Sequence, residues 1–499
     1  MKLFRRDEKP AWYIALIPII VLVITIFFVI KIFDADALSG ASQVALLFAS
    51  GITVMISMVF YRVPWSDFEE AIVDNFSSVA AALVILLLIG ALAGSWMVSG
   101  VVPTLIYYGL KVIAPAIFLF ATCLISCLIS LMTGSSWTTI ATIGVALIGI
   151  GTAQGYAPGI IAGAIISGAY FGDKVSPLSE TTIMAASSSG TPLFTHIRFL
   201  MYTTIPSIAI ALVIFLILSL THDAPSVSEM GKFSEALKET YNISPWLLLV
   251  PVFTGILIAK KVPAIITLFA GSVFAGIAAL IFQPDLIWQV ANADAIAAGT
   301  VSITANHDLS GYDAFKGLMM TYYGPTSIDC GDPAITELVA TKGITGMLNT
   351  IFLIMCAITF GGVMTGSGMI QSFTDLLLKY VKKRTSVVAA TVGTGIFANL
   401  TTSDQYLSIL LTSSLYKKLY EDNGLENKLL GRSVEDSATI TSVLIPWNSC
   451  GMTQATVLKV PTLEYLPFCF FNILSPIMSI FIAAIGFKIV HKEPKQKTT

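Results

Sequence analysis

Charged residues are scarce in this chain of 499 residues, of which 12% are Asp, Glu, Lys or Arg and 55% are hydrophobic. Ordinary soluble domains carry about 25% charged residues, so a water-soluble globular protein of this length is excluded. Apolar runs of about 20 residues recur, the length that crosses a hydrocarbon core about 30 Å thick. The sequence therefore predicts an all-α polytopic membrane protein with about twelve membrane segments.

Histidine and cysteine are also sparse. The four histidines lie far apart along the chain, and the six cysteines show neither a disulfide framework nor a CxxC metal site. The sequence contains no HExxH, GxSxG or GxxxxGKS/T stretch. These absences argue against an enzyme. The sequence also lacks a repeated stretch that would form rings of charge in a selectivity filter, which argues against a channel. We expect no cofactor and no nucleic-acid partner.

Lysine and arginine are unevenly distributed among the polar connections. They gather before the first apolar run, near Arg62, at Lys260, within 379–384, within 417–432 and in the tail. The long connections 221–244 and 283–342 are acidic and sparse in basic residues. Because basic connections stay in the cytoplasm, we expect both termini inside, both long connections outside, and a location in the inner (plasma) membrane.

The two halves of the chain share an order of Gly, Ser and Thr residues. A shift of 268 residues places GSWMVSGVV (94–102) on GVMTGSGMI (362–370) and TGSS (133–136) on TTSD (401–404). A slightly smaller shift places GDKVSPLSETT, from Gly172, on GRSVEDSATIT, from Gly431. Chance similarity between apolar segments is the alternative explanation.

The charges of the connections predict that the two copies are inverted. Basic residues 379–384 correspond to the nearly uncharged 107–112. Inverted repeats build a site at their interface that can face either side of the membrane. The predicted divisions are N-terminal helices 1–75, first repeat 76–221, connecting region 222–342, second repeat 343–490 and tail 491–499.

A first pair of polar interruptions lies at 131–139 and 399–407. Gly, Ser, Thr and Asn between apolar runs predict a turn, which is the tip of a possible re-entrant hairpin. Hydroxyls and freed carbonyls there can ligate a small cation, although helix packing also favours such residues. The first tip lacks the acid of the second, with Ser136 opposite Asp404. The candidate residues are Thr133, Ser135, Ser136, Thr401, Thr402, Ser403 and Asp404.

A second pair of interruptions contains GDKVSP (172–177) and GRSVED (431–436). Pro177 lacks an amide proton and disfavours helical geometry in Ser176; Pro446 acts similarly in the other copy. We therefore expect one unwound helix per repeat, meeting near the midplane. The candidate residues are Asp173, Ser176, Glu435, Asp436, Ser437 and Asn448.

Carboxylates in such a setting have a specific chemistry. A carboxylate surrounded by hydrocarbon takes up a proton, whereas a bound Na⁺ favours the ionised form. One side chain therefore holds either H⁺ or Na⁺, which is what an antiporter requires. Asp173 and Asp436 are the first candidate Na⁺ ligands and Asp404 is the next. The alternative is structural ion pairing, of Asp173 with Lys174 or of Glu435 with Arg432.

Three long stretches, TGSSWTTIATIGVALIGIG, GAYFGDKVSPLSETT and SVLIPWNSCG, resemble those of NhaC-type Na⁺/H⁺ antiporters. The resemblance runs from about Gly51 to the last helix. It implies a secondary transporter that exchanges Na⁺ for H⁺ by alternating access in a lipid bilayer. It also implies a homodimer as a possible assembly. The same family includes malate/lactate antiporters and apparent amino-acid carriers. A Na⁺- or H⁺-coupled exchanger of a small organic anion or amino acid is therefore the alternative.

Overall fold

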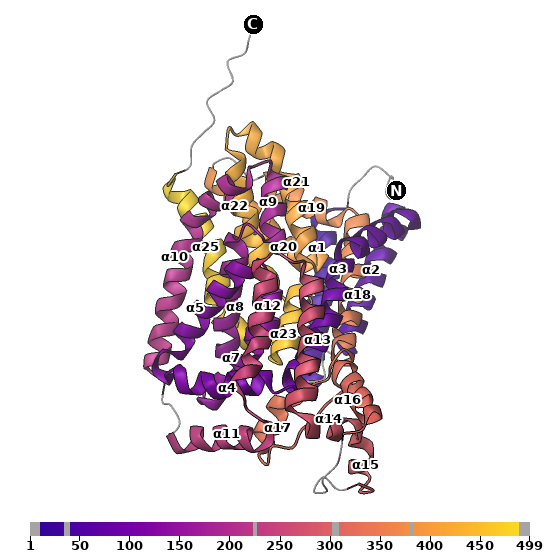
Figure 1. The fold of residues 1–499 in the computed structure, drawn as a ribbon. Coiled ribbons are helices and arrows are strands. Elements are labelled where there is room, and N and C mark those ends of the chain that lie inside the picture. The colour runs from indigo at the N-terminus through magenta and orange to yellow at the C-terminus, as the bar shows by residue number, and fades with distance from the viewer. Residues whose placement is uncertain (1–9, 34–39, 223–226, 302–308, 380–383, 489–499) are drawn as a thin grey trace.

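A computed structural model describes residues 10–33, 40–222, 227–301, 309–379 and 384–488 of the chain. These residues form helices and turns, and one isolated antiparallel bridge joins Thr326 to Thr341. Long helices run side by side between two ends, where shorter helices lie (Figure 1). The predicted all-α polytopic architecture is confirmed.

Eight helices of the described ranges are long and apolar enough to cross a membrane, and two bent helix pairs raise the number to ten. The eight spans are α1 (Trp12–Phe33), α2 (Ala41–Tyr61), Val79–Val98 of α3 (Trp65–Val98), Pro115–Thr133 ending in α5 (Phe118–Thr133), Ser136–Ala153, α10 (Leu193–Leu220), α13 (Ala264–Phe282) and α18 (Thr345–Gly366). The bent pairs are Gly231–Thr240 with Pro245–Ala259 and Thr462–Phe468 with Phe470–Ile485.

This count is lower than the predicted twelve because the central helices are polar. α8 (Pro158–Val175), α20 (Arg384–Thr402) and α21 (Gln405–Asp422) lie among the apolar spans (Figure 1). Their buried residues include many hydroxyls, amides and charges. Helices that turn polar groups toward a protein interior do not need the continuous apolar surface by which a span is recognised.

The polar connections separate by end. α1 begins and α25 (Phe470–Ile485) ends at the upper end in Figure 1, toward which the connections from α2 to α3 and from α12 (Leu249–Ala259) to α13 also turn. The helices of the two long acidic connections lie at the lower end: α11 (Val227–Thr240), α14 (Pro284–Ala291), α15 (Ala293–Ala297), α16 (Gly311–Tyr323) and α17 (Pro333–Val339). The basic residues before Pro10 and the predicted tail 491–499 lie outside the described residues.

Two series of helices follow the same order in opposite directions (Figure 1). In the first, α3 descends to α4 (Val101–Val112), α5 rises, the next segment returns, and α8 with α9 (Glu180–Ser189) rises again. That returning segment comprises α6 (Ser136–Thr139), the π-helical η3 (Ile140–Gly144) and α7 (Val145–Ala153). The first series ends with α10, which descends.

In the second series α18 rises to α19 (Met369–Lys379), α20 descends and α21 returns. The chain then descends through α22 (Asn427–Val434), the π-helical η5 (Glu435–Thr439), η6 (Ser442–Leu444) and α23 (Ser449–Leu458), and rises in α25. The inverted arrangement predicted from the connections is therefore present.

Two glycines set the position of α8 against α5. A Cβ on Gly168 or Gly172 would collide with α5 backbone atoms, at Cys123 and Leu131 respectively. Spaced four residues apart, they let the two helix backbones approach closely, as small residues do between membrane helices. This contact brings the end of α8, with Asp173, next to the turn between α5 and α6.

Candidate functional site

The chain reverses direction at the tip of the first hairpin. α5 ends at Thr133, and Gly134 takes the left-handed conformation with φ 66°. Ser135 caps the next helix, its Oγ accepting from the Thr138 amide at 3.2 Å. The Thr133 hydroxyl donates to the Ser135 carbonyl at 3.1 Å and lies 3.0 Å from Thr139 Oγ1. The predicted turn between two helices is confirmed here.

The tip of the second hairpin repeats this geometry. α20 ends at Thr402, and Ser403 is left-handed with φ 58°. Asp404 caps α21, its Oδ1 accepting from the Leu407 amide at 3.0 Å. The Thr402 hydroxyl donates to the Asp404 carbonyl at 3.0 Å and lies 2.9 Å from Ser408 Oγ.

Equivalent hydrogen bonds correct the alignment of the two repeats. The matching pairs are Thr133 with Thr402, Gly134 with Ser403, Ser135 with Asp404, Thr138 with Leu407 and Thr139 with Ser408. Their offset is 269 residues, the separation of Thr133 from Thr402. The predicted opposition of Ser136 to Asp404 is wrong by one residue: Ser135 lies opposite Asp404.

The predicted offset of 268 does hold earlier in the repeats. Gly100 and Gly368 are both left-handed, with φ 81° and 72°, and follow α3 and α18. The second repeat therefore contains one more residue between this glycine and its hairpin tip. Such an insertion in a connection is tolerated, because loops accept changes of length that packed helices do not.

The broken helices obey the same offset of 269. The Ser130 hydroxyl donates to the Ala169 carbonyl at 2.5 Å, and the equivalent Asn399 amide donates to the Ala438 carbonyl at 2.7 Å. The caps of the helices that follow the two breaks also correspond. Ser179 caps α9, and Asn448 caps α23.

The predicted pairing of Gly172 with Gly431 is consequently wrong. Gly172 packs against Ser130, and Thr441 lies 3.1 Å from the Asn399 amide, so Gly172 corresponds to Thr441. Gly431 instead lies in α22, before the break, and packs against His196. The residue identities that the two stretches share gave a misalignment, because the stretches lie at different positions along their helices.

Asp173 joins the first tip to the break in α8. Its Oδ2 accepts from the Ser136 amide at 3.1 Å and from the Ser136 hydroxyl at 2.7 Å, and its Oδ1 accepts from the Ser179 hydroxyl at 2.6 Å. The side chain therefore caps the amino end of the helix Ser136–Ala153, where the helix dipole favours a negative charge. Asp173 is buried, with 5% of its surface exposed.

In the second repeat the acid lies on the hairpin instead of the broken helix. Asp404 is buried, and its Oδ2 accepts from the Ser449 hydroxyl at 3.0 Å. The Ser449 amide, at the start of α23, donates to the Ser403 carbonyl at 2.8 Å. This backbone contact ties the second tip to the break before α23. Asp404 thus lies at the amino ends of two helices, α21 and α23.

The contact that Asp173 makes in the first repeat has a neutral counterpart. The offset of 269 places Gln405 opposite Ser136 and Ser442 opposite Asp173. The Ser442 hydroxyl donates to Gln405 Oε1 at 3.1 Å, and the Cys450 thiol lies 3.0 Å from the same oxygen. Each repeat therefore has one buried carboxylate at its tip and break, but on different elements.

Asp436 is engaged by basic residues. Lys174, from the first repeat, forms an ion pair with Asp436 Oδ1. The hydroxyls of Ser475 and Thr203 donate to the same oxygen at 2.9 and 3.1 Å, and Arg432 Nε lies 4.0 Å from Oδ2. All of these side chains are buried.

Both ion pairs that were predicted as the alternative are therefore wrong, because each names the wrong acidic partner. Lys174 pairs with Asp436 instead of Asp173, and Arg432 faces Asp436 instead of Glu435. Glu435 is fully buried and interacts electrostatically with Lys174, Asp173 and Asp436. The π-helical turn η5 carries Glu435 and Asp436 together into this cluster.

Four other predicted residues donate hydrogen bonds to backbone carbonyls. Ser176 donates to the Leu131 carbonyl at 2.9 Å, and Ser437 donates to the Ser433 carbonyl at 2.7 Å. Thr401 donates to the Phe397 carbonyl at 2.9 Å. Asn448 donates to the Asn399 carbonyl at 3.2 Å and caps α23.

The three predicted Na⁺ ligands do not meet in one place. Asp173, Asp404 and Asp436 have separate hydrogen-bond partners. Within the described ranges, no group of three or more His, Cys, Asp or Glu side chains is arranged around a common metal position. Within these ranges the three carboxylates therefore occupy separate positions.

Several contacting residues were missed from the sequence. They are Ser179, Thr203, Gln405, Ser442, Ser449 and Ser475. The correct offset would have found Gln405 and Ser442, because they correspond to Ser136 and Asp173. Thr203 and Ser475 lie in apolar helices, where local sequence gives no sign of what they face.

Comparison with known proteins gives two close relatives by sequence. The Na⁺/H⁺ antiporter NhaC of Bacillus subtilis is 36% identical over 442 residues, covering 88% of this chain and 91% of the relative. That of Alkalihalophilus pseudofirmus is 37% identical over 438 residues, covering 87% and 89%. The malate-2H⁺/Na⁺-lactate antiporter of Bacillus subtilis is 31% identical, covering 95% and 93%.

A solved structure, that of Neisseria gonorrhoeae MtrF, covers 98% of this chain and 98% of its own at 12% identity, with a TM-score of 0.38. A likeness that low establishes no shared fold. The model of the Na⁺/H⁺ antiporter family matches residues 10–187 and 168–487, which together span both repeats. The chain belongs to the Na⁺/H⁺ antiporter family.

Proposed function

We propose that this chain exchanges Na⁺ for H⁺ by alternating access. One observation carries the proposal: Asp173 is a buried carboxylate whose hydrogen-bond partners are hydroxyls and an amide, at a break between two helices. Such a group binds a proton or a small cation in turn, because either neutralises it. The similarity to NhaC proteins supports Na⁺ as the cation.

The three carboxylates take different parts in this proposal. Asp173 and Asp404 are the principal Na⁺ positions, and the hydroxyls and carbonyls around them supply further oxygen ligands. Asp436 is the third position. Because Lys174 and Arg432 already balance its charge, it takes up a cation only when its pair with Lys174 opens.

The exchange follows from competition at each carboxylate. On the side where Na⁺ is plentiful and protons are few, Na⁺ occupies the site. On the acidic side, protons displace it. Inverted repeats let the same site face each side in turn, so movement of one cation in one direction is coupled to movement of the other in reverse.

The alternative is exchange of a small organic anion or amino acid coupled to Na⁺ or H⁺. A specific observation favours keeping it: a cavity of about 520 Å³ lies beside the second hairpin, which is larger than a bare ion requires. Two relatives carry names of this kind, the malate/lactate antiporter above and the arginine/ornithine antiporter of Halobacterium salinarum, which is 30% identical.

The remaining assignments belong to the same proposal. The upper end in Figure 1 faces the cytoplasm, because the basic connections lie there, and the membrane is the inner (plasma) membrane. The protein acts as a transporter without enzymatic activity or a resident cofactor, and it assembles as a homodimer.

Reconstitution in liposomes tests the proposal. Addition of Na⁺ to vesicles with a trapped pH dye should move protons without any organic solute. Asp173→Asn and Asp404→Asn should each abolish this signal, whereas Asp67→Asn, which changes an exposed acid, should leave it intact. Proton movement that requires malate, lactate or an amino acid would establish the alternative, and normal exchange by both site variants would refute the assigned positions.

A further inference from the structure

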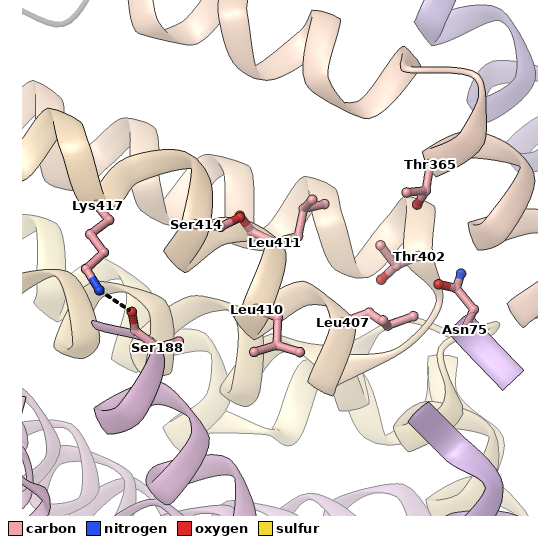
Figure 2. A pocket seen from close by; sticks show the side chains of 9 residues that line it. All are labelled: Asn75, Ser188, Thr365, Thr402, Leu407, Leu410, Leu411, Ser414 and Lys417. Atoms are coloured by element: carbon pink, nitrogen blue, oxygen red, sulfur yellow. Dashed lines mark hydrogen bonds between the residues drawn. The ribbon is translucent and has the colours of Figure 1, made fainter. Parts of the chain in front are cut away.

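A cavity of about 520 Å³ lies along one face of α21. Its other walls come from α3, α18, α20 and α9, through Asn75, Thr365, Thr402 and Ser188 (Figure 2). The wall from α21 combines leucines with Ser414 and Lys417. The cavity is thus bounded by both repeats.

Two residues that line the inner end of the cavity contact Asp404. The Thr402 hydroxyl donates to the Asp404 carbonyl, and the Leu407 amide donates to Asp404 Oδ1. Lys417 lies at the other end, where its Nζ is 3.5 Å from the Ser188 carbonyl. The ten residues from Leu407 to Lys417 span about 15 Å of helix, so the cavity joins the end of the molecule to the hairpin tip.

The equivalent face of the first hairpin is closed. With the offset of 269, Leu410 corresponds to Ala141, and their exposed fractions are 43% and 4%. Ser414 is exposed, whereas the corresponding Val145 is only partly so. α4 packs against α7, and α23 packs against η3 and α7, so these helices cover the face that in the second hairpin lines a cavity.

The two hairpins are equivalent and lie in inverted orientation, but the matching face is exposed in the second hairpin and covered in the first. The exposed surface of the open side is mostly apolar, and the hydroxyls of Thr365, Thr402 and Ser414 and the amide of Asn75 interrupt it. The Thr402 hydroxyl contacts the backbone carbonyl of Asp404. At about 30 Å³ per water, the cavity has room for a hydrated ion.

We infer that this cavity is the route by which a hydrated Na⁺ reaches Asp404 from the end where Lys417 lies. In the opposite state, the matching face of the first hairpin, at Thr138, Ala141, Thr142 and Val145, opens toward the lower end. The inference rests on the proposed Na⁺/H⁺ exchange, and it names the residues that become accessible in each half of the cycle.

Lys417 gives the route a measurable property. A positive charge at its mouth opposes the approach of a cation and favours that of an anion. Lys417→Gln should therefore lower the KM for Na⁺ applied from this side about two-fold at low ionic strength, with kcat unchanged. A raised KM for an organic anion in the same variant, with no effect on Na⁺, would overturn Na⁺ as the occupant.

Cysteine accessibility tests the route directly. Ser414→Cys and Val145→Cys are matched by the offset, and all six native cysteines are buried, so the unmutated chain is the background control. A membrane-impermeant, positively charged methanethiosulfonate reagent should modify Ser414→Cys from one side only and should block exchange. Val145→Cys should react from the opposite side, and conditions that speed one reaction should slow the other.

The outcomes separate the route from the function. Equal reaction of both cysteines from one side, or exchange unaffected by complete modification of Ser414→Cys, would overturn the route while Na⁺/H⁺ exchange stands. The expected reciprocal labelling in a protein that moves no protons with Na⁺ would refute the proposed function instead. Leu411→Cys and Thr142→Cys form a second matched pair, should either first variant fail to fold.

Discussion

Lys174 on α8 of the first repeat forms a buried ion pair with Asp436 in the π-helical turn of the second. The pair joins the centres of the two repeats, and Ser475 of α25 donates a hydrogen bond to the same carboxylate oxygen. Each charge depends on the other, because an unpaired charge in a protein interior is costly.

Removing one partner should therefore destabilise the protein strongly. Lys174→Gln should lower the free energy of unfolding by about 3 kcal/mol or more, measured as thermal unfolding in detergent. The double variant Lys174→Gln/Asp436→Asn should recover much of the loss. Lys428→Gln is the control, because its pair with Glu426 is partly exposed; we expect a change of about 1 kcal/mol or less. Additive losses in the double variant would show that the pair does not couple.

The hydroxyls around Asp173 should tune its affinity for Na⁺. Ser136→Ala and Ser179→Ala each remove a donor to the carboxylate, so H⁺ competes better with Na⁺. Hydrogen bonds to charged groups contribute about 1.5–3 kcal/mol, so the KM for Na⁺ should rise by a factor of about ten or more. Ser66→Ala removes a similar bond to exposed Asp67 and should leave KM unchanged. Unaltered KM in both site variants would exclude Asp173 as a Na⁺ position.

The corrected alignment predicts opposite effects at two matched turn positions. Gly134 and Ser403 are both left-handed, a conformation that costs a residue with a side chain about 1–2 kcal/mol. Ser403→Gly should therefore stabilise the protein, by about 1 kcal/mol. Gly134→Ala should destabilise it, since a Cβ there would also collide with Leu178. Circular dichroism melting checks both, and a stabilising Gly134→Ala would contradict the turn geometry.

The contact between α5 and α8 should tolerate no added methyl group. Gly168→Ala pushes a Cβ into α5 and should cost about 1–3 kcal/mol. Gly255→Ala in α12 is the matched control, because a Cβ there meets no atom within 4 Å. It should be neutral or stabilising, as alanine favours helix over glycine. Similar losses in the two variants, measured by thermal unfolding, would argue against the close approach of α5 and α8.

Local sequence was sufficient to place the breaks in the helices. Gly134 with its flanking hydroxyls, and Pro177 after Ser176, mark positions where helical hydrogen bonding ends, whatever surrounds them. The polar interruptions therefore predicted both tips, and Pro177 and Pro446 marked the two unwound segments. The predicted interruption GRSVED (431–436) is itself helical, because it lies in α22 and η5, before the break. The hydrophobic composition also predicted the architecture. A polytopic membrane protein is indicated by the sum of many residues, and this sum does not depend on any particular contact between helices.

Pairings between distant helices could not be predicted in this way. The ion pair of Lys174 with Asp436 depends on how α8 and η5 rotate about their axes, and Lys174 lies next to Asp173 in sequence, which suggested a false partner. The offset of 269 was missed at the tips because the shift of 268 set by Gly100 and Gly368 was extended without a gap. At the breaks it was missed because Gly172 and Gly431 are identical residues, whereas the true equivalents Gly172 and Thr441 are not. In these two repeats, matching hydrogen bonds identify the equivalent positions where residue identities do not.

The exchange of roles between the repeats has a kinetic consequence. At its tip and break, the first repeat carries a buried acid, Asp173, on the broken helix, whereas the second carries Asp404 on the hairpin. A duplicated ancestor with identical halves would run equally well forward and backward. Because the acids of the two repeats lie on different elements, the inward and outward legs of the cycle meet unlike barriers, so this carrier should respond unequally to gradients of the same size imposed in opposite directions.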